Sequence, residues 1–365
     1  MNTQRHWVEP QDIAHIYESL PLWWAAVDNR ITPWGALKNL LERESYHVSR
    51  FQSKEFASKL KEAIQQFDPD VVLIEGLPPT QYIRSLRQWT SATIIYRAHN
   101  IEHRIWQRLM HQERNFLKRR YLQIQVTRLQ RYEIEMLTSF PPDSIITFTY
   151  EDAQSLREFG FNRPILVKPF PIRLEEYKPC FCGESPPSLF HIGSLQWTPN
   201  ADAVVWFIEE IFPLVRRQVP HATFHLAGYI PPGFHLPTGD GVVVHGVVPD
   251  ARAFMRERSI LVVPLRAGSG IRVKIIEAMA LGKAVVSTRI GAEGITCRSG
   301  EHLLLADSAE EFAAAVVELL RNPTRIEQLG KNARQYIEQH HNWEQVQRDF
   351  VEFLKHVAEQ NPKRR

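Results

Sequence analysis

The chain has 365 residues, of which 44% are hydrophobic and 23% charged, and its formal net charge is +3. At roughly 150 residues per domain this length predicts about two domains, and the apolar fraction excludes a mostly disordered chain. The 44 basic and 41 acidic side chains are spread along the whole sequence, which argues against a nucleic-acid-binding protein.

Hydrophobic periodicity predicts an α/β chain. The first 50 residues contain one expected helix, over 35–44, and no strand is expected before Val71. From there short apolar runs alternate with longer amphipathic stretches, the pattern of parallel sheets with crossover helices. The expected strands are 71–74, 93–96, 145–147, 165–167, 189–192, 223–227, 242–245, 261–264 and 284–287. The expected helices are 51–67, 101–137, 201–218, 271–281, 312–320, 325–340 and 343–359.

Five prolines between residues 168 and 188 interrupt this alternation and predict an interdomain linker. We expect an N-terminal domain over 1–172, a linker over 173–188, a second domain over 189–342, and a C-terminal helix and tail over 343–365. The helix over 343–359 is a candidate to complete the first domain. Ligands bind beyond the carboxyl ends of open parallel sheets, so we expect the site in a cleft between two Rossmann-like domains.

Cysteine usage and the N-terminus predict a reduced, cytoplasmic location. Cys180, Cys182 and Cys297 are too few, and odd in number, for a disulfide framework. A Cys-x-Cys pair without a second pair is a poor zinc signal, so no metal site is predicted. The first residues show no apolar core of a secretory signal.

Residues 261–288 contain the strongest chemical signal. Only four of the 17 glycines precede residue 189, and two of the later ones, Gly268 and Gly270, flank Ser269 between an expected strand and a helix that starts near Ile271. Small residues free the backbone to present amide hydrogens at a helix N-terminus, which is a ready anion site. The turn therefore predicts an anion-binding loop.

Charged side chains follow this turn. Arg272 and Lys274 fall in the first helical turn, where cations oppose the helix dipole. A bound diphosphate would offset that repulsion, with Arg272 donating as a fork and Lys274 acting as a point charge. Glu277 lies about one turn beyond Lys274. It is placed either to accept hydrogen bonds from sugar hydroxyls or to form a surface ion pair with Lys274.

The sequence over 268–288 resembles the donor-site signature of family 4 glycosyltransferases of the GT-B fold. It reads GSGIRVKIIEAMALGKAVVST. Further stretches that resemble the donor domain of that family are FHIGSLQWTPNADAVVWF from residue 190, FHLAGYIPP from 224, VVHGVVPDARAFM from 243 and IGAEGI from 290. The resemblance covers roughly residues 70–340 and is stronger in the second half.

The resemblance implies a retaining transfer of a sugar from a nucleotide diphosphate sugar, such as a UDP- or GDP-sugar, to a glycan or lipid-linked acceptor. It implies no bound metal and no cofactor. Arg272 and Lys274 would then neutralise the departing diphosphate, which a divalent ion does in other transferases. Gly193, Ser194 and the amides around Gly270 would complete the phosphate cradle.

The rest of the implied donor site includes two departures from the family. Glu277 would hold the ribose, and the backbone at Val247 and Val248 would meet the nucleobase. Many members have a glutamate eight positions before Glu277, where this chain has Ser269, so the donor sugar is not predicted. The loop over 194–200 also lacks the cations that members often have there.

The first domain offers fewer candidates. His99 follows an expected strand, and the resemblance suggests that it faces the donor sugar and the acceptor as a hydrogen-bonding or proton-transferring group. Asn100 is expected to cap the helix that begins at Ile101. Glu75 and Gly76 follow the strand over 71–74 and are candidates for the acceptor side, with a solvated loop as the alternative.

The expected helix over 101–137 has eight basic and four acidic residues. Clustered basic side chains attract anionic head groups, so peripheral contact with the inner face of a membrane is one interpretation. A solvated helix face is the other.

Two functions remain open from the sequence. The first is a glycosyltransferase, and the second is a nucleotide-sugar-binding protein without transfer activity. Relatives begin with a strand and a Gly-rich loop, and nothing before Gly76 resembles that pair. We therefore expect the first domain to lack its first strand–loop–helix unit, which is the reason to consider the second function.

Overall fold

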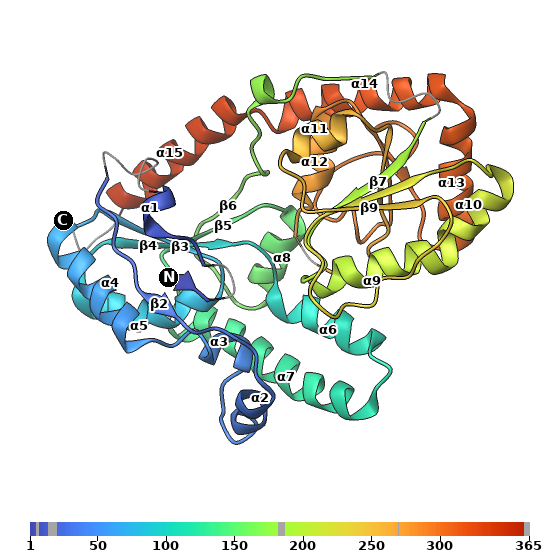
Figure 1. The fold of residues 1–365 in the computed structure, drawn as a ribbon. Helices are drawn as coiled ribbons and strands as arrows, with labels where there is room; N and C mark the ends of the chain where they lie inside the picture. Colours follow the sequence, from blue (N-terminus) through green and yellow to red (C-terminus); the bar gives the residue numbers. More distant parts are fainter. Residues whose placement is uncertain (5–6, 14–19, 182–186, 269, 361–365) are drawn as a thin grey trace. The chain divides into compact units, whose positions relative to one another are not determined.

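The computed structural model describes residues 1–4, 7–13, 20–181, 187–268 and 270–360 (Figure 1). The chain divides into two compact units. The first comprises Met1–Lys168 together with Phe350–Arg365, and the second comprises Pro169–Asp349. Each is built on a parallel sheet, as the alternation of strands and helices predicts.

The first unit contains a four-stranded parallel sheet in the order β3-β4-β5-β6. Its strands are β3 (Val71–Glu75), β4 (Thr93–Ala98), β5 (Ser144–Thr147) and β6 (Ile165–Val167). Its helices include α1 (Pro10–Ile13), α2 (Pro33–Asn39), α3 (Tyr46–Ser49), α4 (Lys54–Phe67), α5 (Ile83–Trp89), α6 (Glu102–Gln112), α7 (Phe116–Ser139) and α8 (Tyr150–Glu158), with a 3-10 turn at Pro78–Tyr82. The buried core joins β3, β4 and β5 to α5, α7 and α8.

Two features of the first unit differ from expectation. A short parallel pair, β1 (Asn2–Thr3) with β2 (Ala26–Val27), precedes Val71, where no strand was expected. Two-residue strands are too short to produce a periodic signal. The single helix expected over 101–137 is wrong, because it is broken between α6 and α7, where the Asn115 side chain accepts from the Lys118 amide and starts a new helix.

The second unit contains a six-stranded parallel sheet in the order β12-β11-β10-β7-β8-β9. Its strands are β7 (Leu189–Ile192), β8 (Phe224–Ala227), β9 (Val242–Gly246), β10 (Ile260–Val263), β11 (Ala284–Ser287) and β12 (Leu304–Leu305). Its helices include α9 (Thr198–Trp206), α10 (Phe212–Gln218), α11 (Ala251–Arg256), α12 (Val273–Ala280), α13 (Ala309–Arg321) and α14 (Pro323–His340), with a 3-10 turn at Leu174–Glu176.

Two apolar clusters cover the two faces of this sheet. One joins it to α9, α10 and α13, and the other to α11, α12 and α14. Between α9 and α10 the helix widens into a π-turn at Phe207–Ile211. The turn precedes Pro213, which lacks the amide hydrogen that a regular α-helix would require. Because both faces are covered over most of the sheet, the strands are mostly apolar, and this is why they were recognisable in the sequence; the edge strand β9 is largely exposed.

The units divide at Lys168–Pro169, before the expected linker over 173–188. The described part of that segment is tied to the second unit, because His341 Nδ1 donates to the Phe170 carbonyl and Ile172 pairs with Asn342. The last helix, α15 (Trp343–Glu359), starts in the second unit and ends in the first. Among the described residues, no helix is both long and apolar enough to cross a bilayer.

Candidate functional site

Lys274 is the centre of a buried polar network in the second unit. Its Nζ donates to His191 Nε2 (3.1 Å) and to Asn200 Oδ1 (3.0 Å). His191 is fully buried in β7, and its Nδ1 lies 2.9 Å from the Val262 carbonyl oxygen. Nδ1 therefore carries the proton and donates, which leaves Nε2 to accept from Lys274.

Burial sets the charge states in this network. It lowers the pKa of Lys274 to about 7, and the neighbouring Arg272 charge acts in the same direction. Burial also holds the pKa of His191 well below its ordinary value, so His191 is neutral. An anion bound beside Lys274 would favour the ammonium form and raise the pKa of that group again.

Glycines allow this network to form. Gly193 follows β7 with φ +152°, and a Cβ there would lie 2.7 Å from Lys274 Nζ and 2.8 Å from Asn200 Nδ2. Gly228 follows β8, and a Cβ there would lie 2.1 Å from the Gly193 carbonyl oxygen. Asn200 Nδ2 donates to the Ser194 carbonyl at 3.0 Å. The loop after β7 contains no cation of its own, but its Ser194 carbonyl holds Asn200, which in turn accepts from Lys274.

Arg272 is buried rather than projecting from the first helical turn. It is the N-cap residue of α12, its Nη1 donates to the Gly270 carbonyl at 2.9 Å, and its guanidinium lies 5.4 Å from the Trp197 ring centroid. A Cβ at Gly268 would lie 2.3 Å from Arg272 Nη2. Ile271 packs against the adjacent apolar core.

Ser269 lies outside the described residues. The described part of the loop places two cations, Arg272 and Lys274, beside the N-terminus of α12.

Glu277 has a partner that the sequence did not indicate. Tyr177 donates its hydroxyl to Glu277 Oε1 at 2.8 Å. Burial raises the pKa of Glu277, while the Tyr177 hydrogen bond and the charges of Arg252 and Lys274 oppose that rise. Tyr177 was missed because it lies a hundred residues upstream, in the segment interpreted as a linker.

The remaining donor-side candidates lie at the same edge of this sheet. Val247 and Val248 follow β9, directly after Gly246, whose φ is +67°. Val247 is exposed, and Val248 packs against the α11–α12 side of the core. Because carboxyl ends of parallel strands share one edge, the loops that follow β7, β9 and β10 converge there.

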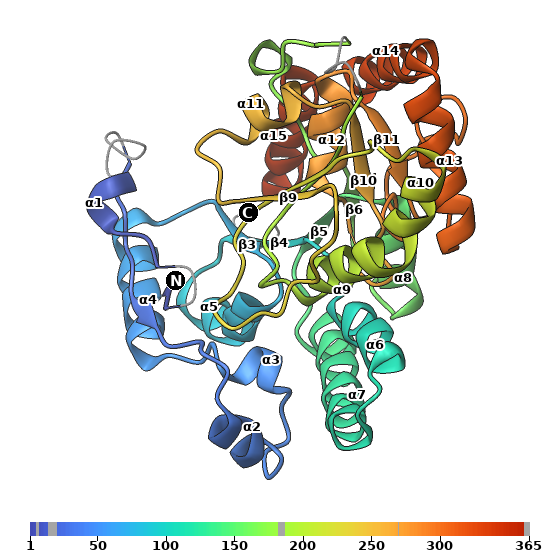
Figure 2. The same cartoon turned by 45° about the vertical axis from the view of Figure 1, so that its right-hand side comes forward.

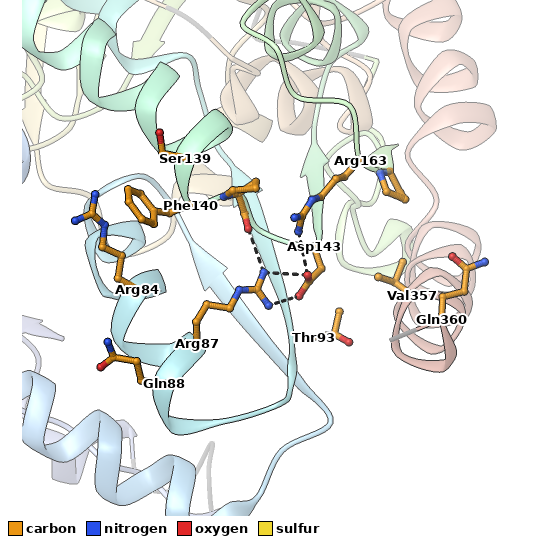
Figure 3. A pocket seen from close by; sticks show the side chains of 12 residues that line it. Arg84, Arg87, Gln88, Thr93, Ser139, Phe140, Asp143, Arg163, Val357 and Gln360 are labelled. Carbon is orange, nitrogen blue, oxygen red and sulfur yellow. Dashed lines mark hydrogen bonds and ion pairs between the residues drawn. The ribbon is translucent and has the colours of Figure 1, made fainter. Parts of the chain in front are cut away.

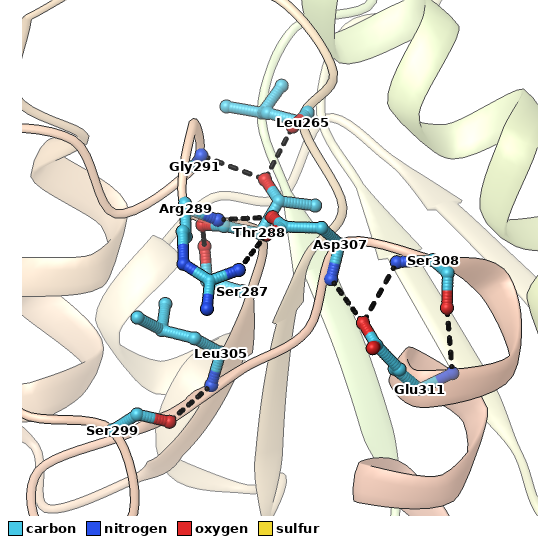
Figure 4. A network of polar contacts seen from close by, with 10 residues as sticks. All are labelled: Leu265, Ser287, Thr288, Arg289, Gly291, Ser299, Leu305, Asp307, Ser308 and Glu311. Atoms are coloured by element: carbon cyan, nitrogen blue, oxygen red, sulfur yellow. Dashed lines mark hydrogen bonds and ion pairs between the residues drawn. The ribbon is translucent and has the colours of Figure 1, made fainter.

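A second network holds the loop that follows β10 (Figure 4). Thr288 donates to the Leu265 carbonyl (2.5 Å) and accepts from the Gly291 amide (2.9 Å), and Ser287 donates to the Val263 carbonyl (3.2 Å). Ser287 and Thr288, at the end of the 268–288 motif, thus hold the loop after β10 in which the motif begins.

In the first unit the structure brings together His99, Glu75 and Gly76. His99 Nε2 lies 2.9 Å from Glu75 Oε2, and Arg97 pairs with the other oxygen of Glu75 at 3.0 Å. The Gly76 amide donates to the Arg97 carbonyl (3.1 Å), and its φ of +75° turns the chain away from β3. Glu75 can orient the imidazole, which suits His99 to hydrogen-bond a hydroxyl group of a ligand.

The expected cap of α6 is wrong. Asn100 does not cap this helix, and Ile101, its N-cap residue, makes no side-chain cap bond. The buried Glu133 of α7 accepts from the amides of Glu102 and His103, each at 3.0 Å, and from His103 Nδ1 at 2.6 Å. A carboxylate satisfies two free amides at the N-terminus and complements the helix dipole.

A cavity of about 800 Å³ lies at the opposite edge of the first sheet (Figure 3). Its lining includes Thr93 and Asp143, at the amino ends of β4 and β5. Asp143 binds Arg87 at 2.7 and 2.9 Å, Arg163 at 3.1 Å and the Ile94 amide at 2.8 Å. These pairs join strand starts to α5, and no predicted site residue lines the cavity.

Metal-ligating side chains do not gather in the described ranges: no group of three His, Cys, Asp or Glu residues there is close enough to hold an ion. Of the Cys-x-Cys pair, Cys182 lies outside those ranges.

Comparison with known proteins identifies the kind of domain that holds the Lys274 network. Residues 186–322 match the family described as glycosyl transferases group 1. An uncharacterized 44.6 kDa protein in the cps region of Klebsiella pneumoniae is 22% identical over 303 residues, which are 79% of this chain and 75% of that protein. The second unit thus carries a domain of the group 1 glycosyltransferase kind.

Solved structures share the fold of the chain. Sucrose-phosphate synthase of Thermosynechococcus elongatus superposes with a TM-score of 0.67 at 17% identity, covering 83% of this chain and 77% of that one. The Anabaena protein HepE, solved in complex with UDP and glucose, superposes with a TM-score of 0.65 at 14% identity, covering 96% and 89%. The two α/β units are those of the GT-B fold.

Proposed function

We propose that this chain transfers a sugar from a nucleotide diphosphate sugar to a glycan or lipid-linked acceptor, with retention and without a metal ion. The observation that carries the proposal is the Lys274 network at the carboxyl edge of the group 1 glycosyltransferase domain. A buried ammonium held by His191 and Asn200, with Arg272 beside it, is suited to a diphosphate. The UDP complex of HepE supports a nucleotide donor.

In this mechanism the bond between the sugar C1 and the diphosphate oxygen breaks, and the bonding electrons remain on the diphosphate. Preorganised cations stabilise that charge as it develops, which is usually the largest catalytic contribution. Lys274 uses two of its three N–H donors on His191 and Asn200 and offers the third to the diphosphate. The backbone amides of Gly193 and Ser194 and the N-terminus of α12, near Gly270 and Ile271, supply neutral donors.

The remaining roles follow the same proposal. Glu277 holds the donor ribose, and the segment at Val247–Val248 contacts the nucleobase. His99, oriented by Glu75, hydrogen-bonds the sugar or the incoming acceptor hydroxyl. The chain works in the cytoplasm, peripherally at the inner face of the membrane, where lipid-linked acceptors are found.

Thermal shift with UDP, GDP and their sugars tests donor binding. We expect one nucleotide series to raise the melting temperature and Lys274→Ala to abolish the shift. Lys331→Ala, an exposed lysine of α14 paired with Glu327, is the matched control and should keep it. No shift with any nucleotide sugar would refute the proposal.

Activity assays test transfer. We expect slow donor hydrolysis that is unaffected by EDTA, and release of the sugar with the anomeric configuration of the donor. His99→Ala should lower kcat while leaving the thermal shift by the nucleotide intact. Donor binding without hydrolysis or transfer would indicate the binding-only function instead.

A further inference from the structure

Helix α2 presents its apolar side chains outward. Trp34 and Leu37 lie three residues apart and share one face of the helix, and Leu41 follows in the turn after its last residue; the three side chains are 75%, 56% and 92% exposed. The polar Asn39 on the opposite face is buried at 1% exposure. An amphipathic helix of a soluble domain normally has the reverse orientation.

The first turns of α7 add a second exposed apolar pair within a basic segment. Phe116 and Leu117 are 72% and 76% exposed. The segment 114–131 has six basic residues and no acidic one. Lys118 pairs with Glu113, whereas Arg119 and Arg120 are also exposed on the first turns of the helix. Cations there oppose the helix dipole, so they do not serve the stability of the helix.

Hydrogen bonds hold these two elements together. Gln125 Nε2 donates to Asn39 Oδ1 at 2.9 Å, and Arg128 donates to the carbonyls of Asn39 and Leu40 at 2.8 and 2.9 Å. Arg131 likewise donates to the Arg43 carbonyl. Figure 2 shows α2 and α7 at the same end of the first unit. Two basic residues of the segment, Arg128 and Arg131, therefore hold α2 to α7, whereas the other four are exposed at the start of α7.

We propose that this α2–α7 surface docks onto an anionic lipid bilayer. The surface consists of the apolar residues Trp34, Leu37, Leu41, Phe116 and Leu117 and the basic residues Arg114, Lys118, Arg119 and Arg120. Apolar side chains enter the boundary between head groups and acyl chains, tryptophan being well suited to that depth, while basic side chains contact lipid phosphates. The inference rests on the proposed membrane contact and names the surface that makes it.

The charge of the surface favours a bilayer over a second copy of the chain. A twofold interface would place the basic segment against itself, and like charges brought together repel. An anionic membrane supplies the opposite charge and an apolar layer at the same place. Exposed apolar patches on soluble domains commonly mark such interaction sites.

Co-sedimentation of the full chain with vesicles tests the proposal. We expect binding to vesicles of phosphatidylcholine with 30% phosphatidylglycerol, little binding to phosphatidylcholine alone, and release by high salt. Trp34→Ser/Leu37→Ser/Leu41→Ser should weaken binding on the order of tenfold or more. Lys118→Gln/Arg119→Gln/Arg120→Gln should weaken it about a hundredfold at low salt.

Matched controls separate docking from folding and from catalysis. Phe67→Ser removes an exposed apolar ring of α4, and Arg289→Gln/Arg298→Gln/Lys331→Gln removes three exposed charges of the second unit. Both should bind vesicles as the unmodified chain does. All variants should keep the thermal shift by the donor nucleotide, so failure of docking is distinguishable from failure of the proposed function.

Three outcomes would overturn the proposal: no binding to anionic vesicles, binding unaffected by the α2 and α7 substitutions, or a concentration-dependent dimer that these substitutions dissociate. The last would assign the surface to a contact between copies.

Discussion

At the residue scale, the position of Lys274 is set by two residues from a distant part of the chain. Lys274 is conspicuous because it lies in the first turn of a helix beside glycines. Its partners His191 and Asn200 belong to strand β7 and helix α9, about 80 residues earlier, and no local pattern connects them. A histidine in an apolar strand that is followed by Gly193 was the available signal. In the folded chain β7 pairs with β10, and this pairing brings His191 of β7 close to Lys274, which lies in the helix after β10.

Binding of UDP at pH 8 should take up close to one proton. The pKa of Lys274 is lowered to about 7, so at pH 8 the Lys274 side chain of the free protein is mostly unprotonated. A bound diphosphate favours its ammonium form, which requires a proton from solution. Affinity should consequently fall as pH rises above 7, by up to tenfold per unit. Isothermal titration calorimetry in buffers of different ionisation enthalpy measures both the proton uptake and the UDP affinity.

Lys274→Arg is the control for this proton uptake, because a guanidinium stays protonated throughout this range. Uptake that persists in Lys274→Arg, or none in the unmodified chain, would contradict the assignment of the proton to Lys274.

Gly193→Ala should weaken UDP binding at least tenfold. The new Cβ would lie 2.7 Å from Lys274 Nζ and 2.8 Å from Asn200 Nδ2, so one of them must move. Gly233→Ala is matched, since Gly233 also has a positive φ but no atom within 4 Å of the Cβ position. It should cost only about 1 kcal/mol of stability and leave UDP affinity intact. Equal UDP affinities of the Gly193→Ala and Gly233→Ala variants would show that the close approach of Lys274 and Asn200 to Gly193 is unimportant for binding.

At the element scale, the strands could be predicted more closely than most of the helix starts. Strands β3 to β11 were found within one or two residues, because each is a short, mostly apolar run between turns. Helix ends depend on contacts with distant residues. Asn115 starts α7 by a local cap, which the sequence analysis overlooked, but the cap of α6 is Glu133, some thirty residues downstream. Such a cap leaves no local signal.

Glu102→Gln should stabilise the chain above pH 7. Burial, and then the nearby Glu133, raises the pKa of Glu102 to about 7. The folded state therefore binds more protons than the unfolded state between about pH 4.5 and 7, and stability is lost as pH rises through that window. Removing the carboxylate should recover about 1–2 kcal/mol at pH 8 and little at pH 4.5, as urea unfolding would show.

Glu55→Gln provides the comparison for Glu102→Gln. Glu55 also lies in the first turn of a helix, α4, so its carboxylate interacts with the helix dipole as that of Glu102 does. Unlike Glu102, it is exposed to solvent. Similar effects of the two substitutions at both pH values would show that burial is not the cause.

At the scale of the whole molecule, the two-domain organisation follows from length and alternation, but the boundaries do not. Prolines marked the region between the domains, yet the segment after Pro169 is anchored to the second unit by His341, which is far away in sequence. Helix α15 shows the same limit in reverse. Its amphipathic pattern predicted its bounds and made it a candidate to complete the first domain, whereas its division between the two units at Asp349–Phe350 depends on what it packs against.

Truncation after Asp349 should weaken the first unit and leave donor binding intact. The removed segment includes Phe350, whose ring lies 4.7 Å from the Arg97 guanidinium, and the buried Val357. Their loss should cost the first unit about 2–4 kcal/mol, visible as faster hydrogen exchange in β3 to β6. The Lys274 network lies wholly in the second unit, so UDP should still bind with affinity within a few-fold of the full chain.

A chain ending at Gln360 should behave as the full chain in both measurements. Loss of UDP binding on truncation after Asp349 would mean that the first unit is required for the donor site, and slow exchange retained in β3 to β6 would mean that α15 contributes nothing to its stability.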